Sequence, residues 1–137
     1  MPTTMRVYSN DRFSLALPAG HRFPMSKYQL LREWVQARAA GLPVGSGPPV
    51  PLRVAEAEPA SDGELALAHE PDYISAVVHG TLSPAALREI GFPWSERMVG
   101  RSRRSVGATI AAARAALVEG VAVQLGGGTH HASAGKG

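Results

Sequence analysis

The stretch from Glu96 to Leu125 constrains the fold of this chain more than any other part of the sequence. Residues 96–119 are predicted to form one long helix, which Gly120 ends, because apolar residues recur on one face at helical spacing. Those apolar positions are Val99, Val106, Ile110, Ala113 and Leu117. The run Val121–Leu125 has the length of a strand and is flanked by glycines, which suits a strand buried on both faces of a parallel sheet. A long helix that leads into such a strand predicts an α/β fold with right-handed crossovers.

The remaining sequence adds two more strands and several shorter helices. We therefore expect a partial parallel sheet of about three strands with flanking helices. The two further strands are expected at Arg6–Tyr8 and Leu52–Ala55, and Pro51 and Pro59 place the second near a sheet edge. The shorter helices are expected at residues 27–40, from Ser61 or Asp62 through Leu67, from Pro71, and from Ser83-Pro84 to Gly91.

The first of these helices has an expected cap and an expected buried face. Ser26 is a suitable N-cap residue, and Gly41 is a suitable stop. Apolar positions at three-to-four spacing predict which side chains face the interior. They are Tyr28, Leu31, Trp34 or Val35, and Arg38 or Ala39.

Composition narrows the class of protein. The 137 residues are 45% hydrophobic and 18% charged, the balance of one globular domain. The lack of cysteine excludes disulfides and thiolate metal sites, and the sequence has no membrane-spanning apolar run and no secretory leader, so we expect a cytoplasmic protein. The net charge of +3 is modest. The cluster Arg97, Arg101, Arg103 and Arg104 is more typical of a solvated helix face than of a nucleic-acid interface.

The segment LGGGTHHA, residues 125–132, carries the clearest indication of chemistry. It follows the predicted third strand, and α/β enzymes place their sites in loops beyond the carboxyl ends of parallel strands. Consecutive glycines allow a substrate to approach the backbone closely, and the adjacent imidazoles of His130 and His131 can accept or deliver protons. A lone histidine pair is most commonly two exposed polar side chains or an accidental metal binder, but its combination with a glycine loop at a strand end favours a site.

These residues resemble a known family. LGGGTHHA is similar to the Gly-Gly-x-His-His-Ala segment of histone deacetylases and their acetoin-utilisation and acetylpolyamine deacetylase relatives. In the same order, GHRFPMSKY resembles the family's early loop, LALAHEPDYISAVV its His-x-Pro-x-Tyr segment, and RSRRSVGATIAAARAAL the helix before the histidine pair. The resemblance implies the amino-terminal half of the arginase/deacetylase-like three-layer α/β/α fold. It also implies that residues 1–137 are part of a single domain, truncated after the His-His loop.

The resemblance also implies roles for particular residues. His131 matches the general base that activates water, and His130 matches its partner, which helps to balance charge on the tetrahedral intermediate. Other matches concern substrate contacts: Gly127 and Gly128 in the wall of the acetamide tunnel, Lys27 in the inner cavity, and Phe92 and Trp94 in a rim loop. Some members hold substrate with an aspartate in that rim loop, and GFPWSER has none. Trp94 is equally well interpreted as an aromatic residue that packs helices together.

The zinc ligands of the family have no counterpart in this sequence. Members bind zinc through an Asp-x-His pair and a second aspartate, and they polarise the carbonyl with a tyrosine; all of these lie downstream of the histidine pair. The aspartates of this chain, Asp11, Asp62 and Asp72, all precede it. We therefore expect the chain to bind no zinc specifically and to be inactive alone, because catalytic zinc needs three protein ligands.

The resemblance implies a substrate class for the complete enzyme, an acetylated small molecule or an acetyl-lysine protein. The alternative is a non-catalytic protein-binding module on the same scaffold. In either case the third strand is expected to present an apolar edge, through which the chain could associate with itself. Contacts with a membrane or with nucleic acid are not expected.

Overall fold

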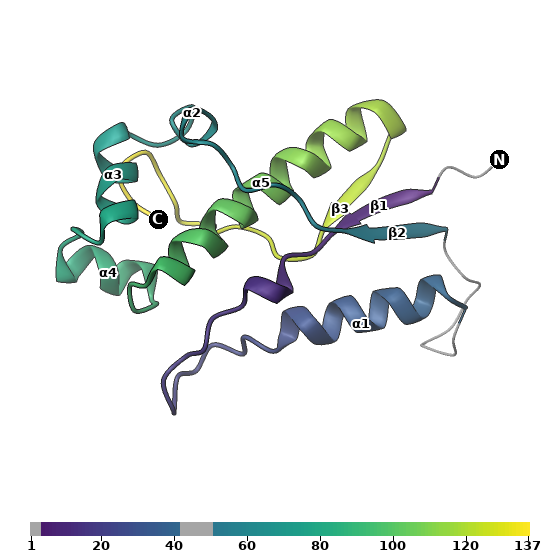
Figure 1. Ribbon diagram of the computed structural model, residues 1–137, viewed down its shortest axis with the longest axis horizontal. Helices are drawn as coiled ribbons and strands as arrows, with labels where there is room; N and C mark the ends of the chain where they lie inside the picture. Colours follow the sequence, from purple (N-terminus) through teal and green to yellow (C-terminus); the bar gives the residue numbers. More distant parts are fainter. Residues whose placement is uncertain (1–3, 42–50) are drawn as a thin grey trace.

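The computed structural model describes residues 4–41 and 51–137, which form a parallel sheet with helices around it (Figure 1). The strands are β1 (Met5–Tyr8), β2 (Leu52–Ala55) and β3 (Ala122–Gln124). The helices are the 3-10 turn η1 (Asp11–Phe13) and α1 (Lys27–Ala39), α2 (Asp62–Leu65), α3 (Pro71–His79), α4 (Pro84–Ile90) and α5 (Glu96–Glu119). The predicted order of strands and helices is confirmed, and each boundary lies within a few residues of the expected one. None of the helices in these ranges is long and apolar enough to cross a membrane.

The three strands run parallel in the order β2-β1-β3. Val7 of the central strand β1 lies between Val54 and Val123, and it is only 2% exposed. β2 is an edge strand, as its flanking prolines predict. The predicted burial of β3 on both faces is only partly observed, because its residues are half-buried and β1 is its one partner in the described sheet. Helices α1 and α5 lie on opposite sides of the sheet, which gives the expected α/β layering (Figure 1).

Helix α5 packs on the sheet through its smallest residues. Ala108 and Ala115 form a buried cluster with Tyr8 of β1. Gly107 lies directly against residues 58–60, where an added Cβ atom would be 1.9 Å from the Glu58 carbonyl oxygen. Small side chains therefore allow the backbone of α5 to approach both the sheet and the segment after β2.

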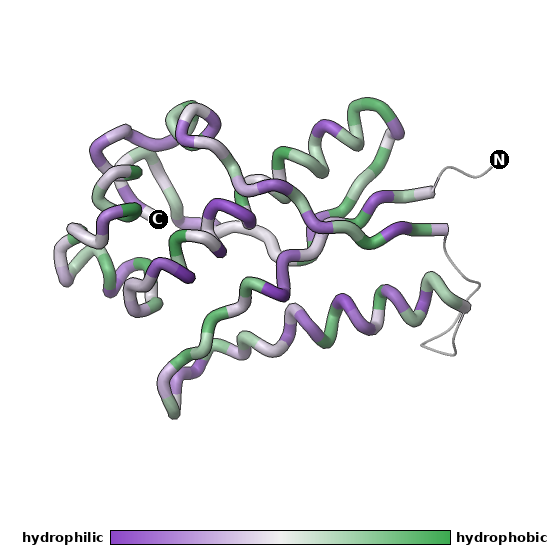
Figure 2. The backbone as a smooth tube through the Cα atoms, viewed as in Figure 1, coloured by the Kyte–Doolittle hydropathy of each residue, from purple (hydrophilic) through white to green (hydrophobic). Residues whose placement is uncertain are grey.

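The predicted buried face of α5 is wrong in the second half of the helix. Ile110 is half-buried, but Ala113 is exposed and Leu117 is 88% exposed. The face that packs on the sheet is the neighbouring one, with Ala108 and Ala115, because a leucine would keep the helix too far from β1. The hydrophobic carboxyl-terminal end of α5 is visible in Figure 2.

The predicted buried face of α1 is also wrong in part. Leu31 and Trp34 are 41% and 47% exposed, whereas Val35, the alternative to Trp34, is half-buried together with Arg32. Figure 2 shows hydrophilic and hydrophobic residues alternating along this helix. The main contacts of α1 with other elements are to the edge strand β2 and to η1, and its first turn also packs against α5 through Tyr28. Ser26 occupies the N-cap position, but its side chain donates or accepts no capping hydrogen bond.

Serine side chains cap three other helices. Ser83 and Ser95 accept hydrogen bonds from backbone N–H groups in the first turns of α4 and α5. Ser61, one of the two predicted caps of α2, forms a reciprocal capping box with Glu64. The backbone N–H of Ser61 donates to the Glu64 carboxylate, and this bond is the main reason that the pKa of Glu64 is lowered.

Candidate functional site

The glycine loop and the histidine pair lie at the carboxyl end of the sheet. The backbone N–H of Leu125 donates to the Tyr8 carbonyl at 2.9 Å, which continues the pairing of β3 with β1 up to the start of the loop. Gly127 has a φ of +65°, a left-handed conformation that favours glycine. The rings of His130 and His131 are exposed and 5.4 Å apart between centroids, at 80° to one another. The two imidazoles therefore stand beyond the strand ends and are open to a ligand.

A cavity of about 620 Å³ opens beside this loop, between α3, α4, α5 and the segment that precedes α1. It contains most of the residues that the sequence analysis selected. His130, His131, Gly127, Gly128, Phe92 and Lys27 all line it. Residues that are more than a hundred positions apart in the sequence thus share one cavity, whose volume is in the range of small-molecule sites.

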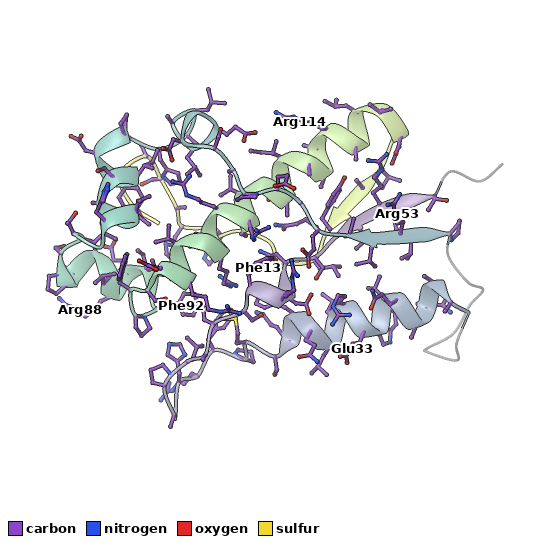
Figure 3. All side chains as sticks on the ribbon, viewed as in Figure 1. Phe13, Glu33, Arg53, Arg88, Phe92 and Arg114 are labelled. Atoms are coloured by element: carbon purple, nitrogen blue, oxygen red, sulfur yellow. The ribbon has the colours of Figure 1, made fainter. Side chains whose placement is uncertain are left out.

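Phe92 and Lys27 belong to an aromatic cluster on one side of the cavity. The Phe92 ring packs edge-on against Phe23, with centroids 5.1 Å apart, and stacks on His21 at 5.8 Å. Phe92 is labelled in Figure 3, beside the loop that precedes α1. The Lys27 ammonium lies 4.5 Å from the centroid of the Phe23 ring, a favourable cation–π distance. Both residues are therefore held by neighbours that come from the early loop.

Trp94 is not among the residues that line the cavity. Its indole N–H donates to the Val77 carbonyl at 2.7 Å, and its ring packs against Gly80 at the end of α3. An added Cβ atom at Gly80 would be 2.8 Å from the indole ring, so the contact is tight. This placement agrees with the interpretation of Trp94 as an aromatic residue that joins α3 to the loop before α5.

The described lining of the cavity is basic. Lys27, Arg101 and Arg103 contribute to it, and none of its described residues is aspartate or glutamate. Four of the chain's five histidines, including His21 and His69, also line it. Tyr28 and Tyr73 also line it, and the pKa of Tyr73 is raised by burial first and by the nearby Glu89 carboxylate second. The cavity therefore offers hydrogen-bond donors and positive charge to a ligand.

Sequence reasoning assigned no role to His69, His21 or Gln124. His69 lies in the His-x-Pro-x-Tyr segment, its ring lies 5.4 Å from that of Tyr73, and its Nδ1 atom is buried with no hydrogen-bond partner in the part of the chain that the structure describes. Gln124 is the last residue of β3 and contacts the glycine loop. A polar residue at the end of the otherwise apolar run VAVQL was the indication that could have revealed it.

The described residues do not fit a catalytic zinc site. Over residues 4–41 and 51–137, no group of three or more His, Cys, Asp or Glu side chains lies close enough to hold a metal ion. His130 and His131 alone cannot provide the three ligands that such a site needs. Any metal chemistry at this loop would depend on donors outside these ranges.

The expectation of a solvated arginine face on α5 is met only in part, because Arg97 is exposed whereas Arg101, Arg103 and Arg104 are half-buried. Each arginine contacts a segment that is distant in the sequence. Arg97 donates to the Ser14 and Arg12 carbonyls, and Arg104 donates to the Ala57 carbonyl. Arg103 donates to the Ala60 carbonyl and to the Asp62 carboxylate. Arg101 lies over the Tyr28 and Phe92 rings. These contacts fix α5 to the loops around it, and they leave fewer of the guanidinium donors for phosphate groups.

Comparison with known proteins agrees with this arrangement. Residues 21–137 match the family model of the histone deacetylase domain. An uncharacterized protein from Picosynechococcus sp. (strain PCC 7002) is 42% identical over 131 residues, which make up 96% of this chain and 41% of that protein. The chain thus spans less than half the length of this relative. Since the family model covers most of the sequence, and the fold is the parallel α/β layering that the resemblance implies, this chain belongs to the histone deacetylase family.

Proposed function

We propose that this chain provides the proton-handling part of a zinc-dependent deacetylase that hydrolyses an acetyl-amide of the acetyl-lysine or acetylpolyamine type. In this proposal residues 1–137 are the amino-terminal part of a single catalytic domain, and the protein acts in the cytoplasm. The observation that carries it is the position of His130 and His131, exposed at the carboxyl end of the sheet and on the wall of a cavity of about 620 Å³. Family membership makes amide hydrolysis the reaction to test.

The two histidines have distinct roles in the proposal. His131 accepts the proton of the water that attacks the acetyl carbonyl carbon, and one of the two imidazoles returns a proton to the departing amine nitrogen. His130 helps to position that water and to balance the negative charge that develops on the carbonyl oxygen. Gly127 and Gly128 form the backbone wall beside the acetyl group, because they have no side chains to fill that space. Phe92 contacts the substrate at the rim of the cavity, and Lys27, which is exposed, adds a positive charge to the cavity wall.

Zinc, which the family implies, requires ligands that the described residues lack. We therefore propose that the ligands are an Asp-x-His pair and a second aspartate in a segment that completes the domain. The extended protein is defined as residues 1–137 joined to a family segment that carries these ligands and the later tyrosine.

The test is acetate release by the extended protein from an acetyl-lysine peptide and from an acetylpolyamine. We expect release from at least one substrate, loss of release with a chelator, and recovery on addition of zinc. A folded, zinc-loaded extended protein that releases no acetate from either substrate would contradict the proposal. The ratio of the two rates assigns the substrate type.

A second candidate function, association with another copy of the chain, is favoured by the exposed apolar residues around β3. Leu117 and Val118 at the end of α5 are 88% and 86% exposed, and Val121, directly before β3, is 53% exposed. No described strand occupies the second edge of β3. Unpaired strand edges with apolar neighbours favour association.

This candidate predicts that the sedimentation coefficient of residues 1–137 rises with concentration, and that the double variant Leu117→Lys/Val118→Lys removes the rise. Leu67→Lys is the matched control, because Leu67 is also 88% exposed but lies in the segment between α2 and α3. A sedimentation coefficient that does not change with concentration would exclude self-association through this face.

A further inference from the structure

The glycine loop is tied to the rest of the fold by two polar side chains. Gln124, at the end of β3, accepts a hydrogen bond from the backbone N–H of Gly127 through its side-chain oxygen. Ser105, in the middle of α5, donates its hydroxyl hydrogen to the carbonyl oxygen of Gly127 at 2.8 Å. Both polar groups of the Gly127 backbone are therefore satisfied by side chains from two different elements.

The same two residues are joined to each other. The side-chain amide of Gln124 donates to the backbone carbonyl of Ser105 at 2.8 Å. Gln124, Ser105 and Gly127 thus form a closed set of three hydrogen bonds between the strand end, the helix and the loop, which we call the loop clamp. A closed set restricts motion more than a single bond does, because breaking one bond leaves two others to hold the geometry.

The neighbouring residues of the loop have few other supports. An added Cβ atom at Gly126 would be 2.9 Å from the side-chain oxygen of Asn10 and 3.8 Å from the side-chain nitrogen of Gln124, so Asn10 packs against the loop beside Gln124. Within residues 127–132, one backbone–backbone hydrogen bond is described, from the Ala132 N–H to the Thr129 carbonyl. Beyond the pair, the Ala134 carbonyl accepts a hydrogen bond from the Glu70 N–H at 2.9 Å, which ties the chain to the start of α3. The histidine pair is therefore held between two anchors, and the loop clamp is the one that joins it to α5.

We infer that Gln124 and Ser105 are positioning residues for the histidine pair, acting through Gly127. The inference rests on the proposed function only for its catalytic consequence; the structural part concerns the loop itself. A base must lie within hydrogen-bond reach of the proton that it accepts, and a misplacement of about 1 Å can cost about a hundredfold in rate. Side chains that fix the loop therefore set the rate without touching the substrate.

The first arm of the test uses residues 1–137 and nuclear magnetic resonance. We expect Ser105→Ala and Gln124→Leu to raise the exchange rate of the Gly127 amide hydrogen by about tenfold or more and to shift the ring signals of His130 and His131. Ser105→Thr keeps the hydroxyl, so we expect its Gly127 exchange rate and its histidine ring signals to match those of the unmodified chain. Gln124→Glu keeps the acceptor for Gly127 but cannot donate to the Ser105 carbonyl, so it protects the Gly127 amide more than Gln124→Leu does.

The matched control is Ser102→Ala. Ser102 lies one turn before Ser105 on α5, and its hydroxyl donates to the Met98 carbonyl within the helix. We expect this variant to leave the Gly127 amide and both histidine signals unchanged. Folded Ser105→Ala and Gln124→Leu variants with Gly127 exchange and histidine signals like those of the unmodified chain would overturn the inference.

The second arm uses the extended protein. Ser105→Ala is expected to lower kcat by about tenfold or more and to change KM less than kcat, because the clamp orients the loop that carries the base as well as the Gly127 wall beside the acetyl group. A change in KM alone would contradict the positioning role. The two arms separate the two proposals: if no acetate is released, the proposed reaction fails, while the exchange rate and ring signals still decide the role of the clamp.

Discussion

His131→Ala in the extended protein is expected to lower kcat for acetyl-amide hydrolysis by about 10²–10⁴-fold, the range that one general base contributes. The structural basis is the exposed imidazole of His131 at the end of β3, on the wall of the cavity. Because the base acts on water and not on the bound acetyl group, KM should change much less than kcat. Steady-state release of acetate from the better substrate measures both constants.

His79→Ala is the control for this experiment. His79 ends α3, its Nδ1 atom lies 2.9 Å from the Ser75 carbonyl oxygen, and it is the one histidine of the chain that does not line the cavity. We expect its kcat and KM to match those of the unmodified protein. Equal losses in His79→Ala and His131→Ala would indicate a general effect of removing an imidazole, and they would remove His131 from the proposed mechanism.

Gly107→Ala is expected to destabilise the fold by about 3 kcal/mol or more, at or above the upper part of the range for overpacked cores. Gly107 is buried in α5, and its added Cβ atom would be 1.9 Å from the Glu58 carbonyl oxygen. That oxygen belongs to the backbone, and the adjacent Ala60 N–H is bonded to the Arg103 carbonyl, so the segment cannot move away without breaking this bond. Urea denaturation followed by circular dichroism measures the loss.

Gly100→Ala is the matched control on the same helix. No atom lies within 4 Å of an added Cβ at Gly100, so the substitution should stabilise the helix by about 0.5–1 kcal/mol, the usual gain of alanine over glycine. The two substitutions are thus expected to change the free energy of unfolding in opposite directions. A Gly107→Ala variant as stable as the unmodified chain would show that α5 does not approach residues 58–60 as closely as described.

Local sequence patterns predicted the elements of this fold well. Ser83, Pro84 and Gly91 bracket α4, and Gly120 ends α5, because caps and stops act through nearby backbone groups. The burial of each helix face was harder to predict. The apolar positions of α5 extend to Leu117, which is exposed, whereas the packed face uses alanine and glycine. Hydrophobicity alone does not reveal how closely two backbones will approach.

The candidate site was predicted in part. Adjacent residues such as His130 and His131 form a motif that the sequence displays directly. His69 lies far from that motif in the sequence, and the fold brings it to the same cavity. Gln124 lies just before the motif, at the end of β3. For Trp94 the resemblance implied a place in a rim loop, with helix packing as an equally good interpretation, and the structure shows its indole N–H bonded to the Val77 carbonyl of α3. Long-range juxtaposition is the information that local patterns lack.

The most direct test of the central claim is the metal dependence of acetate release, measured in parallel for residues 1–137 and for the extended protein. We expect zinc to start acetate release only in the extended protein, since the described residues of this chain provide no set of three donors for the metal. Zinc-dependent turnover by residues 1–137 alone would contradict the account, because the histidine pair would then not need ligands from a completing segment.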